Sequence, residues 1–406
     1  MNSSAVSRMA VAIATIAATV STAAFAAQPA SDTSHASADT VRATVGAAIR
    51  PIMAEYKVPG MAVAVTVAGR HRIFNYGVAS KESGQPVTDD TIFEIGSVSK
   101  TFAATLAAYA QARGAISFND KAVKYLPALA GSAFDGISLL ELGTYTSGGL
   151  PLQVPDGIAD MSQMVDWFRQ WRPDYAPGTI RRYSNPSIGL FGYLAAQALQ
   201  MPFETAISQQ ILPKLGLRHT WIHVPAAQME HYAWGYAKDD KPVRVGPGVF
   251  DEEAYGIKTT AADMIRFVEL NIDGEPVSDP ALRQALRTTH AGYFQVGKMT
   301  QGLGWERYAW PTSLDDLLVG NNETMVMQAN PARRIAPPQP APADVLLNKT
   351  GATDGFGAYA AFVPGKRIGV VMLGNRNMPI PARVKAAHRI LEALLRYDQD
   401  TAEVHP

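Results

Sequence analysis

The stretch that decides how the rest of this chain is interpreted reads FEIGSVSKTF, Phe93 to Phe102. It stands at the start of a strongly helical segment, residues 97–113. In the first turn of such a helix Ser97 and Lys100 share one face, so the lysine amine can reach the serine hydroxyl. Ser97 also lies near the positive end of the helix dipole, where a backbone N–H is free to stabilise an oxyanion. Taken alone, a helix-capping serine followed by a surface lysine is the commoner explanation.

Two further motifs carry groups that could act with this pair. Tyr183-Ser184-Asn185 precedes a predicted helix; a tyrosine near a lysine can ionise in part and act as a general base, and an asparagine amide both donates and accepts. Lys349-Thr350-Gly351 follows the apolar run 345–347, which predicts a strand edge that presents a cation, a hydroxyl and unpaired N–H groups to an anionic substrate. In isolation each motif also fits a structural role: a core tyrosine with a capping asparagine, and an exposed strand with a turn.

Hydrophobic periodicity predicts a sheet built from both ends of the chain. The elements expected there are a helix at 41–56, hairpin strands at 61–67 and 72–78, hairpin strands at 358–363 and 368–373, and a closing helix at 384–397. The middle is predicted to be mostly helical, with helices at 97–113, 161–171, 187–200 and 261–270. We therefore expect a two-lobed α/β protein whose helices cover the sheet and whose middle is an insertion.

Composition excludes several classes of function. The chain has 406 residues with 47% hydrophobic and 18% charged residues, which is typical of a globular protein with a substantial core. Its formal net charge is zero, so nothing points to nucleic acid or to an anionic membrane surface as a partner. There are no cysteines, which excludes cysteine nucleophiles and thiolate metal sites.

The first 26 residues have the pattern of a cleaved export signal. Arg8 precedes an unbroken run of apolar and small residues from Met9 to Phe25, and Ala24-Phe25-Ala26 provides a small-x-small cleavage site. A retained membrane anchor is the alternative, because the run is nearly long enough to span a bilayer. We expect cleavage near Ala26, a flexible leader over 27–39, and a periplasmic protein with no membrane attachment after cleavage.

Considered together, the three motifs point to one superfamily. A serine with a helical lysine partner, then Tyr-x-Asn, then Lys-Thr-Gly on a late strand is the order shared by penicillin-recognising serine enzymes. Class A β-lactamases have Ser-Asp-Asn in the middle position. The tyrosine here resembles the class C (AmpC-type) form, and the similarity extends over residues 40–398. The other similar segments are Thr144-Tyr145-Thr146, 148–156, 187–192, 254–256, 349–357 and 372–384.

This resemblance implies a fold and a reaction. The fold would be β-lactamase/transpeptidase-like, with an antiparallel sheet flanked by the terminal helices and the active site between sheet and helical lobe. The implied domain spans 40–398, with a sheet lobe at about 40–90 and 230–398, a helical lobe at about 91–229, and a tail at 399–406. The implied function is hydrolysis of cephalosporins and penicillins through a serine acyl-enzyme, without metal or cofactor, by a protein expected to be monomeric.

The resemblance also assigns roles to individual residues. Ser97 would be the nucleophile, Lys100 its activating partner and Tyr183 the general acid and base, while Lys349 would hold Tyr183 in its working state. Backbone N–H groups of Ser97 and Ala352 would form the oxyanion hole. The residues expected to contact substrate are Gln153, Asn185, Tyr255, Thr350, Gly351, Asn377 and Arg383. Whether Tyr183 or Lys100 takes the first proton stays open.

Four positions differ from what is usual in that family. Ser184 replaces an alanine, Asn348 a common histidine, Asp354 a usual glycine and Ile380 a carboxylate-contacting asparagine. Asp354 would add a negative charge near an anion site. These differences bear on the choice of substrate and on efficiency more than on the class of reaction.

Other functions are less favoured. His219 and His223 have the spacing of a zinc pair, but the glutamate after the first histidine is missing and no third ligand is visible. No Gly-x-Ser-x-Gly elbow and no nucleotide-binding glycine motif occurs. The alternatives that remain are a D-alanyl-D-alanine carboxypeptidase or esterase with the same machinery, and a penicillin-binding sensor that stays acylated.

Overall fold

The computed structural model describes residues 32–403, with side chains from 39 to 396. The predicted signal peptide, 1–26, lies outside this range. Helix α1, Asp32–Glu55, starts inside the segment predicted as a flexible leader, and helix α13, Ile380–Glu403, continues into the predicted tail. Residues 32–39 and 399–403 are therefore helical rather than leader and tail. Among the described helices, none has the length and hydropathy needed to cross a membrane.

The largest element is an antiparallel sheet of nine strands, in the order β13-β9-β10-β11-β14-β15-β16-β1-β2. Its strands are β1 Gly60–Val67, β2 Arg70–Gly77, β9 Gly292–Val296, β10 Met299–Gln301, β11 Glu306–Ala309, β13 Arg333–Gln339, β14 Val345–Ala352, β15 Gly357–Val363 and β16 Ile368–Gly374. Both predicted hairpins are present, and β1 pairs with β16 so that Met61 faces Gly374. The sheet is thus assembled from the two ends of the chain, as predicted.

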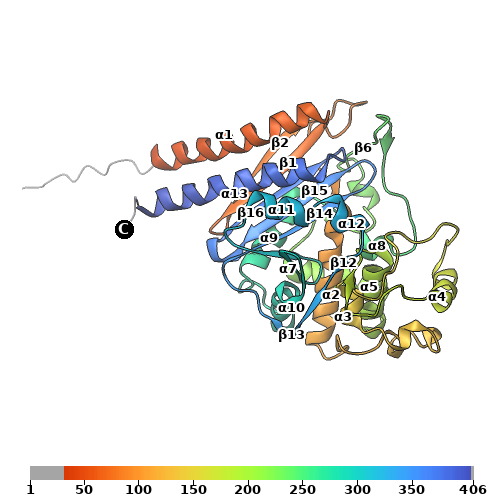
Figure 1. Cartoon of the computed structure of the whole chain (residues 1–406). Coiled ribbons are helices and arrows are strands. Elements are labelled where there is room, and N and C mark those ends of the chain that lie inside the picture. Colours follow the sequence, from red (N-terminus) through yellow and green to blue (C-terminus); the bar gives the residue numbers. More distant parts are fainter. Residues whose placement is uncertain (1–31, 404–406) are drawn as a thin grey trace, which may run out of the picture.

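Helices cover the sheet on both faces. Helix α9, Ala261–Ile272, packs on β1 and β16 on one face, and α13 packs on β15 and β16 on the other, with α1 beside it (Figure 1). Side chains alternate accordingly along each strand: Ala62 and Ala64 of β1 enter one core, and Val63 and Val65 enter the other. Because both faces are buried, these strands are apolar at successive positions rather than at every second one.

Two short helices, α11 Leu314–Gly320 and α12 Glu323–Met327, bury side chains in the same core as α1 and α13, and α11 packs on α13. The remaining helices form the lobe beside the sheet. They are α2 Lys100–Ala112, α3 Leu139–Gly143, α4 Met161–Gln170, α5 Asn185–Ala198, α6 Phe203–Ala206, α7 Leu212–Leu215, α8 Asp251–Ala254 and α10 Pro280–His290. Short strands tie this lobe together: β3 Phe93–Glu94, β4 Ile180–Arg181, β5 Thr220–Trp221, β6 Gly235–Tyr236, β7 Pro242–Val243, β8 Lys258–Thr259 and β12 Asn330–Pro331. Helix α2 packs against α5 and α10, so the predicted long helix lies at the centre of the lobe.

Strand β14 has an unpaired edge where the sheet meets α2. Strand β11 pairs with β14 only up to Asn348, whereas β15 pairs with β14 as far as Ala352. Residues 349–352 therefore have a strand partner on one side only. The 3₁₀ turn Gly96–Ser99, which leads into α2, packs against this half of β14. The predicted strand edge exists because β11 ends early.

Candidate active site

The serine and the lysine of the first motif are in contact. Lys100 is fully buried, and its Nζ donates to Ser97 Oγ at 2.8 Å and to the carbonyl oxygen of Ala254 at 2.7 Å. Ser97 lies in the 3₁₀ turn and Lys100 is the first residue of α2, so the predicted one-face geometry is confirmed. Burial, partly opposed by the nearby Tyr183, lowers the pKa of Lys100 to about 8. The amine is therefore able to lose its proton near neutral pH.

Tyr183 lies next to the contact between Ser97 and Lys100. Its ring centroid is 5.2 Å from Lys100 Nζ and 5.1 Å from Lys349 Nζ, and its hydroxyl is buried with no hydrogen-bond partner among the described residues. Burial by itself would raise the pKa of Tyr183, but the positive charges of Lys100 and Lys349 outweigh it and lower that pKa to about 8. A hydroxyl with this pKa and a free lone pair is equipped to exchange a proton with a ligand.

A buried ion pair lies next to the ring of Tyr183. Arg181 and Glu306 lie 3.1 Å apart with side chains that are 2% and 8% exposed, and the guanidinium also donates to Gln301 Oε1 at 2.6 Å and to the carbonyl oxygen of Met325 at 2.8 Å. The guanidinium carbon of Arg181 lies 5.5 Å from the ring centroid of Tyr183. The sequence analysis missed this pair, because residues more than a hundred positions apart in the chain give no local signal.

The oxyanion-hole candidates meet through backbone contact. Gly96 has φ +50°, and a Cβ there would lie 2.5 Å from the Ala352 nitrogen. A Cβ on Gly351 would lie 2.0 Å from the carbonyl oxygen of Ile95. Glycine at both positions lets the turn that carries Ser97 press against the open half of β14. The backbone groups of Ser97 and Ala352 consequently converge on one point.

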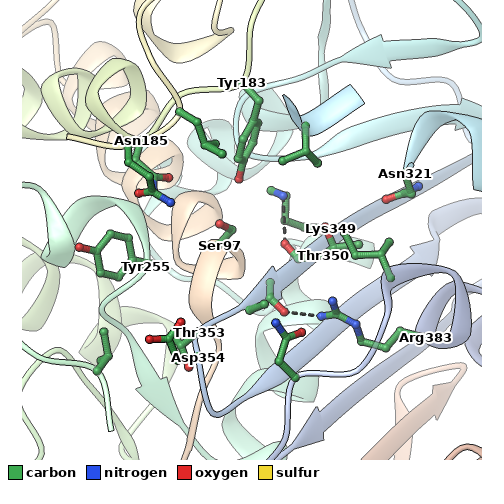
Figure 2. A pocket seen from close by; sticks show the side chains of 18 of the residues that line it. Ser97, Tyr183, Asn185, Tyr255, Asn321, Lys349, Thr350, Thr353, Asp354 and Arg383 are labelled. Carbon is green, nitrogen blue, oxygen red and sulfur yellow. Dashed lines mark hydrogen bonds between the residues drawn. The ribbon is translucent and has the colours of Figure 1, made fainter. Parts of the chain in front are cut away.

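The pocket around Ser97 has two chemically different sides (Figure 2). Its volume is about 480 Å³. Asn185 and Tyr255 lie on one side, and the Asn185 amide donates to Gln153 Oε1 at 2.7 Å while its own oxygen has no partner among the described residues. This arrangement leaves a hydrogen-bond acceptor without a partner at a residue that lines the pocket.

The other side of the pocket is cationic. Lys349 Nζ donates to the carbonyl oxygen of Thr350 at 3.0 Å. Arg383 is 1% exposed and has no carboxylate partner among the described residues; it donates to the carbonyl oxygens of Gly351 and Ala358. Burial lowers the pKa of Arg383 to about 10, which still leaves it charged at neutral pH. Two cations without carboxylate partners on one side favour an anionic group there.

All the predicted site residues belong to this one site. Lys100 lies beneath Ser97, and the others line the pocket: Ser97, Gln153, Tyr183, Asn185, Tyr255, Lys349, Thr350, Gly351, Ala352, Asn377 and Arg383. The unusual Asp354 and Ile380 line it as well, and Asp354 lies on the side of Tyr255 rather than of Arg383. In Figure 2 the side chain at 354 is therefore seen apart from that of Arg383. Among the unusual residues, Ser184 caps α5 by accepting from the Ser187 N–H.

The sequence analysis also missed the wall formed by residues 243–246 and by α11 and α12. Val243, Arg244, Asn321 and Met325 line the pocket there. Arg244 stacks on Tyr232 and Trp234, with its guanidinium carbon about 4 Å from each ring centroid. These residues lie in segments that carry no motif, so only the tertiary structure identifies them.

Metal-ligating side chains approach one another away from this pocket. Glu204, His223 and Glu252 offer ligand atoms that all lie within 4.8 Å of one another, and His223 Nδ1 is 2.9 Å from Glu204 Oε1. His219 is not part of that group, so the pair considered in the sequence analysis is not assembled as a zinc pair. Nothing in the chemistry around Ser97 calls for a metal ion.

Comparison with known proteins agrees with this geometry. The β-lactamase family model matches residues 45–395, which is most of the chain. A β-lactamase of Pseudomonas fluorescens is 54% identical over 88% of this chain and 99% of its own length. One from Escherichia coli K12 is 46% identical over 85% of this chain and 92% of its own length. The chain belongs to the β-lactamase family.

Solved structures place this β-lactamase more narrowly. A class C β-lactamase superposes with a TM-score of 0.85 at 48% identity, covering 87% of this chain and 98% of that one. A class C β-lactamase in complex with cefoxitin gives a TM-score of 0.85 at 47% identity over 87% and 99%. The class C resemblance and the fold predicted from the three motifs are thereby confirmed.

Proposed function

We propose that this β-lactamase hydrolyses cephalosporins and penicillins through an acyl-enzyme on Ser97, and so confers resistance to them. The observation that carries the residue assignment is the convergence of Ser97, Lys100 and Tyr183, with an Oγ–Nζ distance of 2.8 Å and with pKa values of about 8 for both the lysine and the tyrosine. A hydroxyl nucleophile needs a nearby base with such a pKa to react at neutral pH.

Acylation would begin with attack of Ser97 Oγ on the lactam carbonyl carbon. The Oγ proton passes to the pair formed by Lys100 and Tyr183, whose two titrations belong to the pair rather than to either residue. Negative charge then develops on the carbonyl oxygen, and the N–H groups of Ser97 and Ala352 stabilise it. When the carbon–nitrogen bond breaks, Tyr183 returns a proton to the lactam nitrogen, which leaves an ester on Ser97.

Deacylation would use the same tyrosine. Tyr183 takes a proton from a water molecule as that water attacks the ester carbonyl, and the proton passes to Ser97 Oγ when the ester breaks. Lys349, with its Nζ 5.1 Å from the tyrosine ring, keeps the phenol easily ionised throughout. One residue thus serves as base, acid and base again.

The two sides of the pocket suit the two ends of a β-lactam. The carboxylate of the substrate would meet Lys349, Thr350 and Arg383 on the cationic side. The side-chain amide would meet the free oxygen of Asn185 and the amide of Gln153, next to Tyr255. Gly351 would allow close approach, and Asn377 would line the carboxylate side.

The proposal is tested by steady-state hydrolysis of a chromogenic cephalosporin. Ser97→Ala should abolish turnover, by on the order of 10⁴-fold or more, and Tyr183→Phe should lower kcat by about 10²–10⁴-fold. Ser138→Ala, at the buried N-cap of α3 away from the pocket, is the control for loss of a buried serine hydroxyl. Full activity of Ser97→Ala would disprove the assignment.

A second function has one observation in its favour. A structure described as a β-lactamase/D-alanine carboxypeptidase from Pseudomonas syringae superposes with a TM-score of 0.85 at 46% identity. The same serine machinery could therefore also release D-alanine from a peptide ending in D-alanyl-D-alanine. Amino-acid release from such a peptide, lost in Ser97→Ala, would establish this second activity.

We also propose that the protein is exported to the periplasm, cut near Ala26, and monomeric. The small-x-small site at Ala24 to Ala26 after an apolar run supports cleavage there. Mass spectrometry of the exported protein would reveal its new N-terminus, and light scattering would give its mass in solution. A retained N-terminus or a dimer mass would contradict these proposals.

A further inference from the structure

A second pocket lies behind the wall of the catalytic one, beside the packed helices α5 and α8 (both labelled in Figure 1). Met161 of α4 and Phe203 of α6 also line it. It is open to solvent and has a volume of about 870 Å³. Neither the family motifs nor the catalytic residues enter it. Helix α8 separates the two pockets. Its last residue, Ala254, provides the carbonyl that binds Lys100, and the following Tyr255 lines the active site.

The charges around this second pocket are of one sign. Four carboxyl groups line it, and no lysine, arginine or histidine does so among the described residues. The four are Asp160, Asp251, Glu252 and Glu253. Such a lining attracts a cation and repels an anion.

Glu253 is the least ordinary of the four. Its side chain is directed between α5 and α6: a Cβ added to Gly192 would lie 3.1 Å from Glu253 Cγ and 3.2 Å from the Phe203 ring. Only 6% of the residue is exposed, and its carboxyl interacts with its own backbone N–H while no other described residue pairs with it. A buried carboxyl held by so little is costly, and its further partner is normally a ligand, water or ion.

Aromatic rings complete the pocket. Tyr193 and Phe250 lie edge to face with centroids 6.4 Å apart, and Phe203 stands next to Glu253. Phe250 has φ +61°, a left-handed conformation that is strained for a phenylalanine. A carboxylate beside aromatic faces is the usual way in which proteins bind ammonium groups, through charge pairing and cation–π attraction.

We propose that this pocket binds a small organic cation, an ammonium group on an apolar body, with Glu253 as its counter-ion and the Tyr193 and Phe250 rings around it. The apolar body would lie against Met161 and Met201, which also line the pocket. Burial raises the pKa of Glu253 to about 8, and the nearby Asp251 and Glu252 also raise it, so the empty pocket holds this carboxyl protonated at neutral pH. Binding a cation therefore displaces a proton from Glu253.

The test is calorimetric titration with benzyltrimethylammonium, which keeps its charge at every pH, alongside neutral benzyl alcohol. The wild-type protein should bind the cation at one site and the alcohol at least about tenfold more weakly. Glu253→Gln should weaken binding of the cation by about tenfold or more, and Tyr193→Leu by a few-fold. Glu55→Gln makes the same side-chain replacement at an exposed glutamate at the end of α1, and it should bind like the wild type.

The pH dependence separates this site from a general surface attraction. Wild-type affinity should rise as pH approaches about 8, because Glu253 then loses its proton before the cation arrives. The facing groups are Asp160, Asp251, Glu252 and the hydroxyls of Tyr193 and Tyr255, and Glu204 and His223 lie next to Glu252. Burial raises the pKa values of the two tyrosines, so they stay neutral over this range. In Glu253→Gln the affinity should be flat.

Three outcomes would overturn the proposal. One is no binding by the wild-type protein, and a second is equal binding by Glu253→Gln. The third is loss of binding when a cephalosporin occupies the pocket of Ser97→Ala, which would place the cation in the catalytic site. Each can be observed whether or not the enzyme turns over a β-lactam.

Discussion

At the scale of single residues, the proposed catalytic base is the pair Lys100 and Tyr183, which exchanges one proton with Ser97. Lys100 and Tyr183 both have pKa values near 8, for different reasons: burial dominates at the lysine, and two neighbouring cations dominate at the tyrosine. Below this pH both groups are protonated, and neither can accept the Ser97 proton. Above it the pair has lost a proton and provides a base. The activity should therefore increase as pH rises toward about 8.

Replacing Lys349 tests whether a neighbouring positive charge sets the pKa values of Lys100 and Tyr183. Its positive charge lowers the pKa of both Lys100 and Tyr183, so Lys349→Met should raise both. The acidic limb of kcat/KM for a cephalosporin should shift to higher pH by up to about one unit. Lys298→Met removes a charge from an exposed position and is the matched control. A limb that stays in place would show that Lys349 does not set these two pKa values.

At the scale of elements, the active site is a junction between a turn and a half-paired strand. The turn Gly96–Ser99 can approach β14 only because position 351 has no side chain. The sequence patterns predicted the turn and the strand separately, without the contact between them. How closely the turn approaches the strand is set by their packing, and the proposed oxyanion hole of the Ser97 and Ala352 N–H groups depends on this approach.

Gly351→Ala should therefore damage catalysis more than stability. A Cβ 2.0 Å from the carbonyl oxygen of Ile95 must push the turn and strand apart, and a shift of this kind costs on the order of 10²-fold in kcat. Unfolding in urea should show a loss of about 1–3 kcal/mol. Gly136→Ala, where φ is also not positive and an added Cβ comes no closer than 3.7 Å to the carbonyl oxygen of Ala133, is the control for glycine replacement. Unchanged kcat in Gly351→Ala would contradict this account of the junction.

Glu94 joins three elements around the same junction. It is 1% exposed, and one carboxylate oxygen accepts from Tyr232 Oη at 2.5 Å and from the Val245 N–H at 2.7 Å, while the other accepts from Thr353 Oγ1 at 2.6 Å. It thereby connects β3, the loop that lines the pocket, and the end of β14. The donors come from positions 138 to 259 residues away, so no local pattern reveals the network.

Removing this carboxylate should destabilise the protein measurably. Glu94→Ala leaves three donors without their acceptor and should cost about 3–5 kcal/mol in urea unfolding. Tyr232→Phe removes one hydroxyl and should cost about 1 kcal/mol. In a double-mutant cycle, the effect of Tyr232→Phe should vanish in the Glu94→Ala background. Additive losses would show that the two residues act independently.

At the scale of the whole molecule, the two ends of the chain hold the sheet together. Helices α1 and α13 lie side by side over one face and bury a core of their own, separate from the core under α9 (Figure 1). Ile390 of α13 is fully buried there, and its neighbour Arg389 is exposed. Arg383 of the same helix lines the catalytic pocket, so this helix belongs both to the second core and to the site where we propose that substrate binds.

Ile390→Ala should lower stability without changing catalysis. A large-to-small change at a fully buried aliphatic residue costs about 2–5 kcal/mol, and Arg389→Ala, one position away on the exposed face, should cost less than about 0.5 kcal/mol. Because Ile390 does not line the pocket, KM for a cephalosporin should be unchanged below the melting range of either variant. A changed KM would mean that the core under α13 controls the position of Arg383.

The sequence by itself determined what depends on neighbouring residues. Helical spacing places Ser97 and Lys100 on one face, alternating and continuous apolar runs give the terminal hairpins, and three motifs in a fixed order indicate the family and its reaction. The exact ends of α1 and α13 were not determined, because a helix is extended or stopped by the surface on which it packs.

Only the tertiary structure decided what depends on distant residues. It alone brings Lys349 to Tyr183, ends β11 so that β14 has an open edge, pairs Arg181 with Glu306, and leaves Glu253 buried in a second pocket. These groups interact through space by charge, burial and close packing. Their energies depend on separation in three dimensions, and the order of residues along a chain does not encode that separation locally.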